Sequence, residues 1–151
     1  MPAPTSPLRA YVSALSAALE AVDQADLPDD GSNLPLRFED PSGNEGGTVR
    51  HRTFHFAAPL SWDWKRGHGA ALPELGYSIR LVVWCHRENR TPTDQAFAVL
   101  ELAAAVSRVY LALTEAQPAG VQSAVLGRGS YDPLTGRMEF PIAVATLEQA
   151  S

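Results

Sequence analysis

The sequence predicts an α+β fold: a mainly antiparallel sheet with a long helix packed on one face and a further helix at the N-terminus. Two stretches place apolar residues at helical spacing, and three others alternate them as strands do. The expected order is helix, three strands, helix, two strands, which suits helices packed on one face of a sheet. We expect one domain over 1–151, with long loops at about 40–48 and 59–76.

The first helix is predicted from apolar residues at three- and four-residue steps: Leu8, Tyr11, Val12, Leu15, Leu19 and Val22. Ser6 is the expected N-cap, and Pro7 fits the first helical position because its missing N–H is not needed there. A short strand over 34–39 is predicted to follow.

The middle of the chain predicts two strands separated by a loop. The strand over 49–58 places Phe54 and Phe56 on one face, together with Arg50 and Arg52. A second strand over 77–86 is apolar on both faces near its end, so we expect it at the centre of the sheet. The residues over 59–76 fit neither period, and long loops of this kind are often functional.

The second helix begins at Thr91, a capping residue, and Pro92. Its apolar stripe contains Val99, Leu102, Ala103, Val106, Tyr110 and Leu113. Phe97, Leu100 and Leu111 widen that stripe, which predicts heavy packing across the sheet and against a neighbour.

A β-hairpin is predicted at the C-terminus. Residues 121–127 and 138–144 alternate as strands, and Pro133 and Gly136 favour a turn between them. Pro141 cannot donate to a ladder, so we expect an edge position or a bulge there.

Composition narrows the class of protein. The formal net charge of -5 gives no support for non-specific nucleic-acid binding. A single cysteine excludes an internal disulfide. It also argues against a cysteine-based zinc site, which needs several cysteine ligands. The longest apolar run is interrupted by Glu101, Ser107 and Arg108, so we expect no membrane partner, and the N-terminus lacks the pattern of a signal peptide.

We expect no enzyme, no catalytic residue, no metal site and no cofactor. Cys85 and His86 are adjacent in a predicted strand, so their side chains point to opposite faces and cannot form a thiolate–imidazole pair. Cys85 shares its face with apolar residues, which predicts a buried thiol. Two interpretations from other classes stay open: a small hydrolase using Cys85 or a histidine, and a ligand-binding module lined by Trp62, Trp64 and Trp84.

The region 59–76 also carries the candidate interface. Trp62 and Trp64 stand beside Arg66 and His68, and aromatic and arginine side chains are enriched at binding hot spots. The alternative is that the two tryptophans fold back into the core.

Four segments together resemble the tail-terminator and tail-completion proteins of long-tailed phages, including the lambda-type terminator. They are the opening helix 8–15, the strand 77–84, the long helix 96–113, and the closing hairpin 131–140 with 142–144. The resemblance covers most of the chain, and the region 40–76 departs from it most, being longer and richer in tryptophan.

The resemblance implies a structural protein of the virion, assembled in the host cytoplasm. It would form a homo-hexameric ring that caps the tail tube and joins it to the head or neck. Its partners would be the tail tube protein and a neck or head-completion protein, and DNA would pass through the lumen without specific binding. Another head–tail connector or neck protein of the same fold is the second interpretation.

We expect the subunit contacts of such a ring at two places. One is the strand 49–56, with Arg50 and Arg52, and the other is the hairpin around Tyr131 and Arg137. The loop with Trp62 and Trp64 is expected to contact a tail or neck partner.

Overall fold

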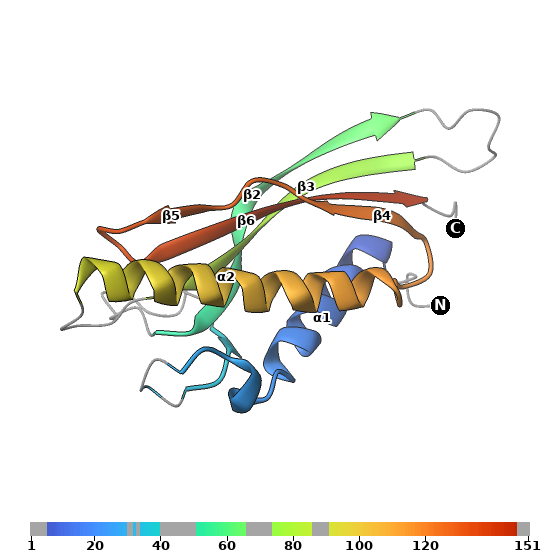
Figure 1. Ribbon diagram of the computed structural model, residues 1–151. Coiled ribbons are helices and arrows are strands. Elements are labelled where there is room, and N and C mark those ends of the chain that lie inside the picture. The colour runs from blue at the N-terminus through green and yellow to red at the C-terminus, as the bar shows by residue number, and fades with distance from the viewer. Residues whose placement is uncertain are drawn as a thin grey trace.

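The fold is α+β, as predicted, with two helices on one face of a mixed and mostly antiparallel sheet (Figure 1). The computed structural model describes residues 6–29, 32, 34–39, 51–65, 74–85 and 91–147. Its elements are α1 (Pro7–Glu20), the 3-10 helix η1 (Gln24–Asp26), β1 (Arg37–Phe38), β2 (Thr53–Lys65), β3 (Glu74–Trp84), α2 (Pro92–Thr114), β4 (Val121–Leu126), β5 (Ser130–Asp132) and β6 (Arg137–Leu147).

The strand order is β1-β2-β3-β6-β4, and β5 also pairs with β6. Only β1 and β2 run parallel, while the other neighbours are antiparallel. β3 lies between β2 and β6, so the prediction of a central strand is confirmed.

Both helices begin where the sequence predicts. The Ser6 hydroxyl accepts a hydrogen bond from the Arg9 N–H at 3.2 Å, and Thr91 Oγ1 accepts one from the Asp94 N–H at 3.2 Å. Proline follows each cap, at the position where a missing N–H costs nothing. Each N-terminal turn is therefore set by a local cap.

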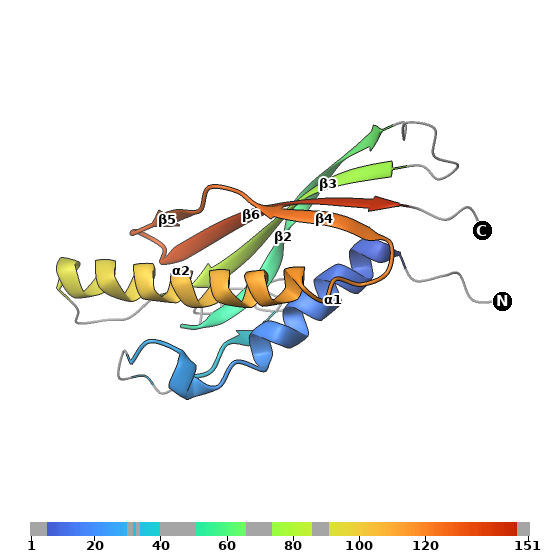
Figure 2. The ribbon, with the colours of Figure 1, turned by 45° about the vertical axis from the view of Figure 1, so that its right-hand side comes forward.

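The core lies between the helices and the sheet (Figure 2). Its largest fully buried side chains are Tyr11, Phe54, Leu15, Leu19, Leu36, Ile79, Leu81, Leu102, Ile142, Val82, Val83 and Val106. Tyr110 ties α2 to β4, because its hydroxyl donates to the Ala124 carbonyl and accepts from the Leu126 N–H at 3.2 Å. These contacts fix α2 across the strands of the C-terminal hairpin.

The predicted loop over 59–76 is wrong at both ends. β2 continues to Lys65 and β3 begins at Glu74, and the two strands pair residue by residue over these ends. A register shift between Ala57 and Ser61 interrupts the alternation that a sequence pattern needs, which explains the wrong prediction. The other predicted loop, 40–48, lies outside the described residues.

Two more strand bounds differ from those predicted. The strand expected over 34–39 pairs only through Arg37 and Phe38, with Thr53 and Phe54. The strand expected from residue 49 begins at Thr53, since Arg52 has a φ of 62° and cannot belong to an extended strand.

Pro141 lies in β6, which is an internal strand and not an edge, and of the two predicted alternatives the bulge agrees with the pairing: residues 127–129 stand opposite the two residues 140–141. The Gly127 N–H donates to the Pro141 carbonyl at 2.8 Å, and the chain over 127–129 separates β4 from β5. A strand residue turns its N–H and C=O toward the same neighbour. The N–H that proline lacks is therefore directed at the break between β4 and β5, where no ladder bond is lost.

Candidate interface surfaces

The first candidate surface is the outer half of the β2–β3 hairpin, which we define as residues 61–65 paired with 74–78. Trp62 pairs with Tyr77 and Trp64 pairs with Leu75, so all four side chains share one face of the sheet. That face is the helix side, because Tyr77 packs against the core. The outer half extends beyond the helices (Figure 1), and Trp62 and Trp64 are 72% and 60% exposed.

These exposures decide between the two interpretations of the tryptophans. Side chains that filled the protein's own core would be buried, and these two are not. Trp84 lies on the opposite face of β3, where it pairs with Arg137. The three tryptophans therefore do not line one pocket, which corrects the ligand-binding interpretation built on them.

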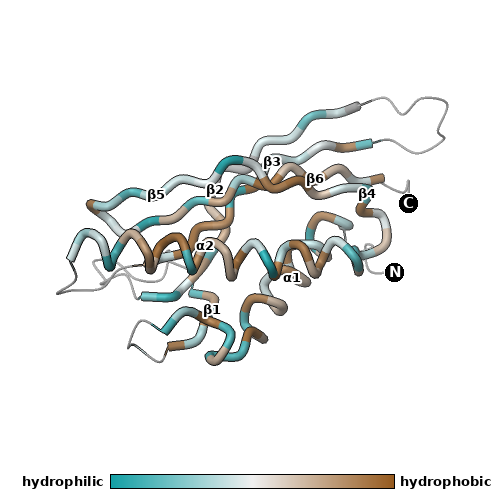
Figure 3. The backbone as a smooth tube through the Cα atoms, viewed as in Figure 1, coloured by the Kyte–Doolittle hydropathy of each residue, from teal (hydrophilic) through white to brown (hydrophobic). Residues whose placement is uncertain are grey.

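The second candidate surface is the outer face of α2, formed by Phe97, Leu100 and Leu111. These side chains are 60%, 65% and 59% exposed. By length and composition α2 could cross a membrane, and most of its apolar window is not buried within the domain. Figure 3 shows hydrophobic residues along this helix, interrupted by polar ones.

These three residues widen the apolar stripe but take no part in the predicted packing across the sheet, so the predicted packing against a neighbour is what remains for them. Ala98, Val99, Leu102, Ala105 and Val106 are the residues of α2 that are buried. Positions 97, 100, 104 and 111 repeat at steps of three, four and seven, which is a heptad-like stripe of its own. That signal is present in the sequence and indicates a second apolar face.

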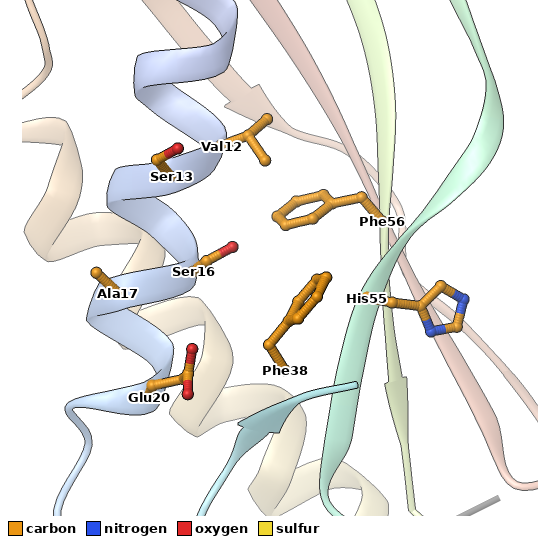
Figure 4. Close-up of a pocket in the computed structure, with 8 residues that line it drawn as sticks. All are labelled: Val12, Ser13, Ser16, Ala17, Glu20, Phe38, His55 and Phe56. Carbon is orange, nitrogen blue, oxygen red and sulfur yellow. The ribbon is translucent and has the colours of Figure 1, made fainter. Parts of the chain in front are cut away.

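The third candidate surface is a groove of about 580 Å³ between α1 and the start of the sheet (Figure 4). Its lining residues are Val12, Ser13, Ser16, Ala17, Glu20, Phe38, His55 and Phe56. The rings of Phe38 and Phe56 point into the groove toward α1, and His55 points away from it. No sequence pattern indicates this groove, because its two walls, α1 and the β1–β2 pair, are far apart in the chain.

The groove adjoins an edge of the sheet. β1 pairs with β2 only at Thr53 and Phe54. Among the described residues, no strand pairs with the outer edge of β2 over 56–65. An uncovered edge of this kind offers backbone donors and acceptors to another strand.

Arg52, a predicted interface residue, is buried inside its own chain. It is 3% exposed, and its guanidinium donates to two backbone carbonyls, that of Leu34 at 2.8 Å and that of Pro28. Its own N–H donates to the Trp84 carbonyl at 2.8 Å. Arg52 therefore connects three segments of the fold.

Tyr131 and Arg137, also predicted interface residues, lie near each other on β5 and β6 but differ in setting. The Tyr131 hydroxyl accepts a hydrogen bond from Gln95 Nε2 at 2.8 Å, which ties β5 to α2. Arg137 forms an ion pair with Glu139 at 2.8 Å and lies over the Trp84 ring, 5.9 Å from its centroid. Arg137 keeps 34% of its side chain exposed and can still meet a partner.

The remaining predicted interface residues, Arg50, Arg66 and His68, lie outside the described residues. The structure therefore brings together Trp62 and Trp64 on one surface and leaves Arg137 on another face of the sheet.

The residues with reactive side chains are buried or scattered. Cys85 is a free thiol, 2% exposed and part of the core, which confirms the predicted buried position. No group of three metal-binding side chains occurs within the described ranges. Burial, with a smaller contribution from Tyr110, raises the pKa of Tyr11 to about 12. The Tyr11 hydroxyl has no hydrogen-bond partner among the described residues.

Comparisons with known proteins leave the family open. No protein-family model matches the chain, and no curated protein matches its sequence.

Proposed function

We propose that this protein is a structural ring subunit of a phage virion, a tail terminator that caps the tail tube and joins it to the head or neck. The observation that carries the proposal is the pair of separate apolar surfaces on one small domain. One is the outer hairpin with Trp62 and Trp64, and the other is the outer face of α2 with Phe97, Leu100 and Leu111.

Large exposed apolar side chains that gather on one surface mark interaction sites in soluble proteins. A ring is built from heterologous contacts, in which one surface of a subunit meets a different surface of the next. Two distinct surfaces are therefore the minimum that a ring subunit needs. Further surface is required for the tube and the neck.

The order of elements supports the terminator class. An N-terminal helix, a central strand leading into a long helix, and a closing hairpin are the features on which the resemblance to phage tail terminators rests. Another head–tail connector or neck protein of the same fold would share them. Identifying which protein contacts this chain in the assembled particle would distinguish a terminator from another connector or neck protein.

Native mass spectrometry of the full chain tests the ring. We expect one closed species, six times the 16.2 kDa monomer. Leu100→Glu on the outer face of α2 should reduce it to smaller species, because a charge at the contact must be desolvated. Leu134→Glu is the matched control, since Leu134 is 90% exposed in the β5–β6 turn, and it should leave the ring intact.

Two results would contradict the proposal. A chain that is monomeric at all concentrations and floats with lipid vesicles through α2 would assign that helix to a membrane. Immunogold labelling of virions should mark the head–tail junction, and labelling at the tail tip or only in the cell would exclude a terminator.

A further inference from the structure

We propose that the outer hairpin of one subunit inserts Trp62 and Trp64 into the groove between α1 and β2 of the next copy. The occupant of the groove is thus a second copy of this chain. The inference rests on the proposed ring and names one of its subunit contacts, in addition to the contact expected at the outer face of α2.

The size of the groove fits this occupant. Its volume of about 580 Å³ lies within the range of roughly 300–1,000 Å³ of pockets that hold drug-sized molecules. Two indole rings are smaller than this volume, so the groove can admit both. The hairpin carries them on one face, two residues apart, so both can enter from the same side.

The chemistry of the walls is also complementary. Phe38 and Phe56 offer aromatic faces, which prefer edge or offset contacts with other rings. An indole carries one N–H donor and no acceptor. Ser13, Ser16 and Glu20 line the α1 side of the groove, and their oxygens are acceptors for such donors. Glu20 adds a negative charge, and hydrogen bonds to a charged acceptor are stronger than those between neutral groups.

The area suffices for a main contact. An aromatic side chain of this kind buries about 150–250 Å², so two supply roughly 300–500 Å² of the approximately 800 Å² that each partner contributes to a standard interface. The edge of β2 beside the groove can supply the remainder through backbone hydrogen bonds. Aromatic anchors seated in pockets also carry most of the energy of protein interfaces.

The position of the two features favours a heterologous contact. The hairpin projects from one end of the molecule, and the groove lies by β1, toward the other end of β2 (Figures 1 and 4). Trp62 and Trp64 cannot reach the groove of their own chain without unpairing the outer part of β2 from β3. A second copy can present them with no such rearrangement.

Cross-linking between two single-cysteine additions tests the contact. Asp63→Cys lies between the two tryptophans and preserves them, with its side chain on the opposite face of β2, and Ala17→Cys lies at the α1 wall of the groove. Both positions are exposed, whereas the native Cys85 is buried, so a bismaleimide with a spacer long enough to pass around the strand reacts at the added thiols. The two variants co-expressed should cross-link to each other, and neither should cross-link to itself. The double variant should give a ladder that ends at the ring.

A matched pair of alanine variants sharpens the result. Trp62→Ala with Trp64→Ala, added to both cysteine variants, should abolish the cross-link. Leu134→Ala removes an equally exposed apolar side chain elsewhere and should retain it.

Three outcomes would overturn the inference. Cross-linking of Asp63→Cys to itself would show that hairpins pair symmetrically. A wild-type ring whose co-expressed variants do not cross-link would close through another surface, and the proposed function would survive. A wild-type monomer without cross-links would remove both proposals.

Discussion

The two halves of the β2–β3 hairpin share the same pairing but have opposite surroundings. In the inner half, Phe54 pairs with Val83 and Phe56 with Leu81, and Phe54, Leu81 and Val83 are almost fully buried beneath the helices. In the outer half, Trp62 and Trp64 pair with Tyr77 and Leu75 on the same face but remain exposed. Strand pairing is thus independent of burial here, and the outer half carries apolar area that its own fold does not use.

That difference separates stability from assembly. The inner half should determine whether the chain folds, and the outer half should determine what the folded chain contacts. Substitutions in each half test this division, and those expected to have the largest effect come first.

Phe54→Ala should lower the free energy of unfolding by about 3–5 kcal/mol, the usual cost of removing a buried phenylalanine side chain. Phe54 is fully buried in β2. Urea denaturation of the full chain gives the change directly. A loss below about 1 kcal/mol would mean that the inner half is not the core of this fold.

Arg52→Ala should cost about 1.5–3 kcal/mol, because it removes hydrogen bonds from a charged donor to the Leu34 and Pro28 carbonyls. Arg137→Ala is the matched control, since Arg137 is partly exposed and its ion pair with Glu139 is of the surface kind. Equal effects of the two substitutions on the urea midpoint would contradict the structural role of Arg52.

Tyr11, a buried residue of α1, should make the stability of the core sensitive to alkaline pH. The pKa of Tyr11 is raised in the folded state to about 12 from a usual value of 10. The contribution of the neutral Tyr11 side chain to the free energy of unfolding is therefore complete below pH 10 and is lost as pH rises toward 12. Tyr11→Phe should remove this dependence while changing stability little at pH 7, since its hydroxyl has no partner among the described residues. Thermal unfolding across pH 9 to about 12 measures both effects. An identical alkaline loss in Tyr11→Phe would assign it to another group.

Trp64→Ala should have the smallest effect on folding, within about 0.5 kcal/mol, as for exposed substitutions in general. Trp64 is 60% exposed in the outer half. Its urea midpoint, measured on the monomer at low concentration, should match the wild type. A clear loss of stability would place Trp64 in the core and erase the difference between the two halves.

Much of the fold was predictable from local patterns. The caps at Ser6 and Thr91, the two helices and the central position of β3 follow from short-range chemistry and residue spacing. The outer hairpin was missed because a register shift between Ala57 and Ser61 breaks the alternation, so its tryptophans were placed in a loop. The exposure of Trp62 and Trp64 agrees with the interface interpretation. Their position on paired strands shows that the predicted loop was wrong at this point.

The sequence by itself determined the two helices, the central strand and the C-terminal hairpin, since helix spacing, capping and turn residues act within a few positions of the chain. Only the tertiary structure decided which apolar residues stay outside the core. Phe97 and Val99 look alike in a periodic pattern, but one faces the solvent and the other the sheet. The groove between α1 and β2 likewise exists only once segments distant in sequence pack side by side, because its walls are set by long-range contacts.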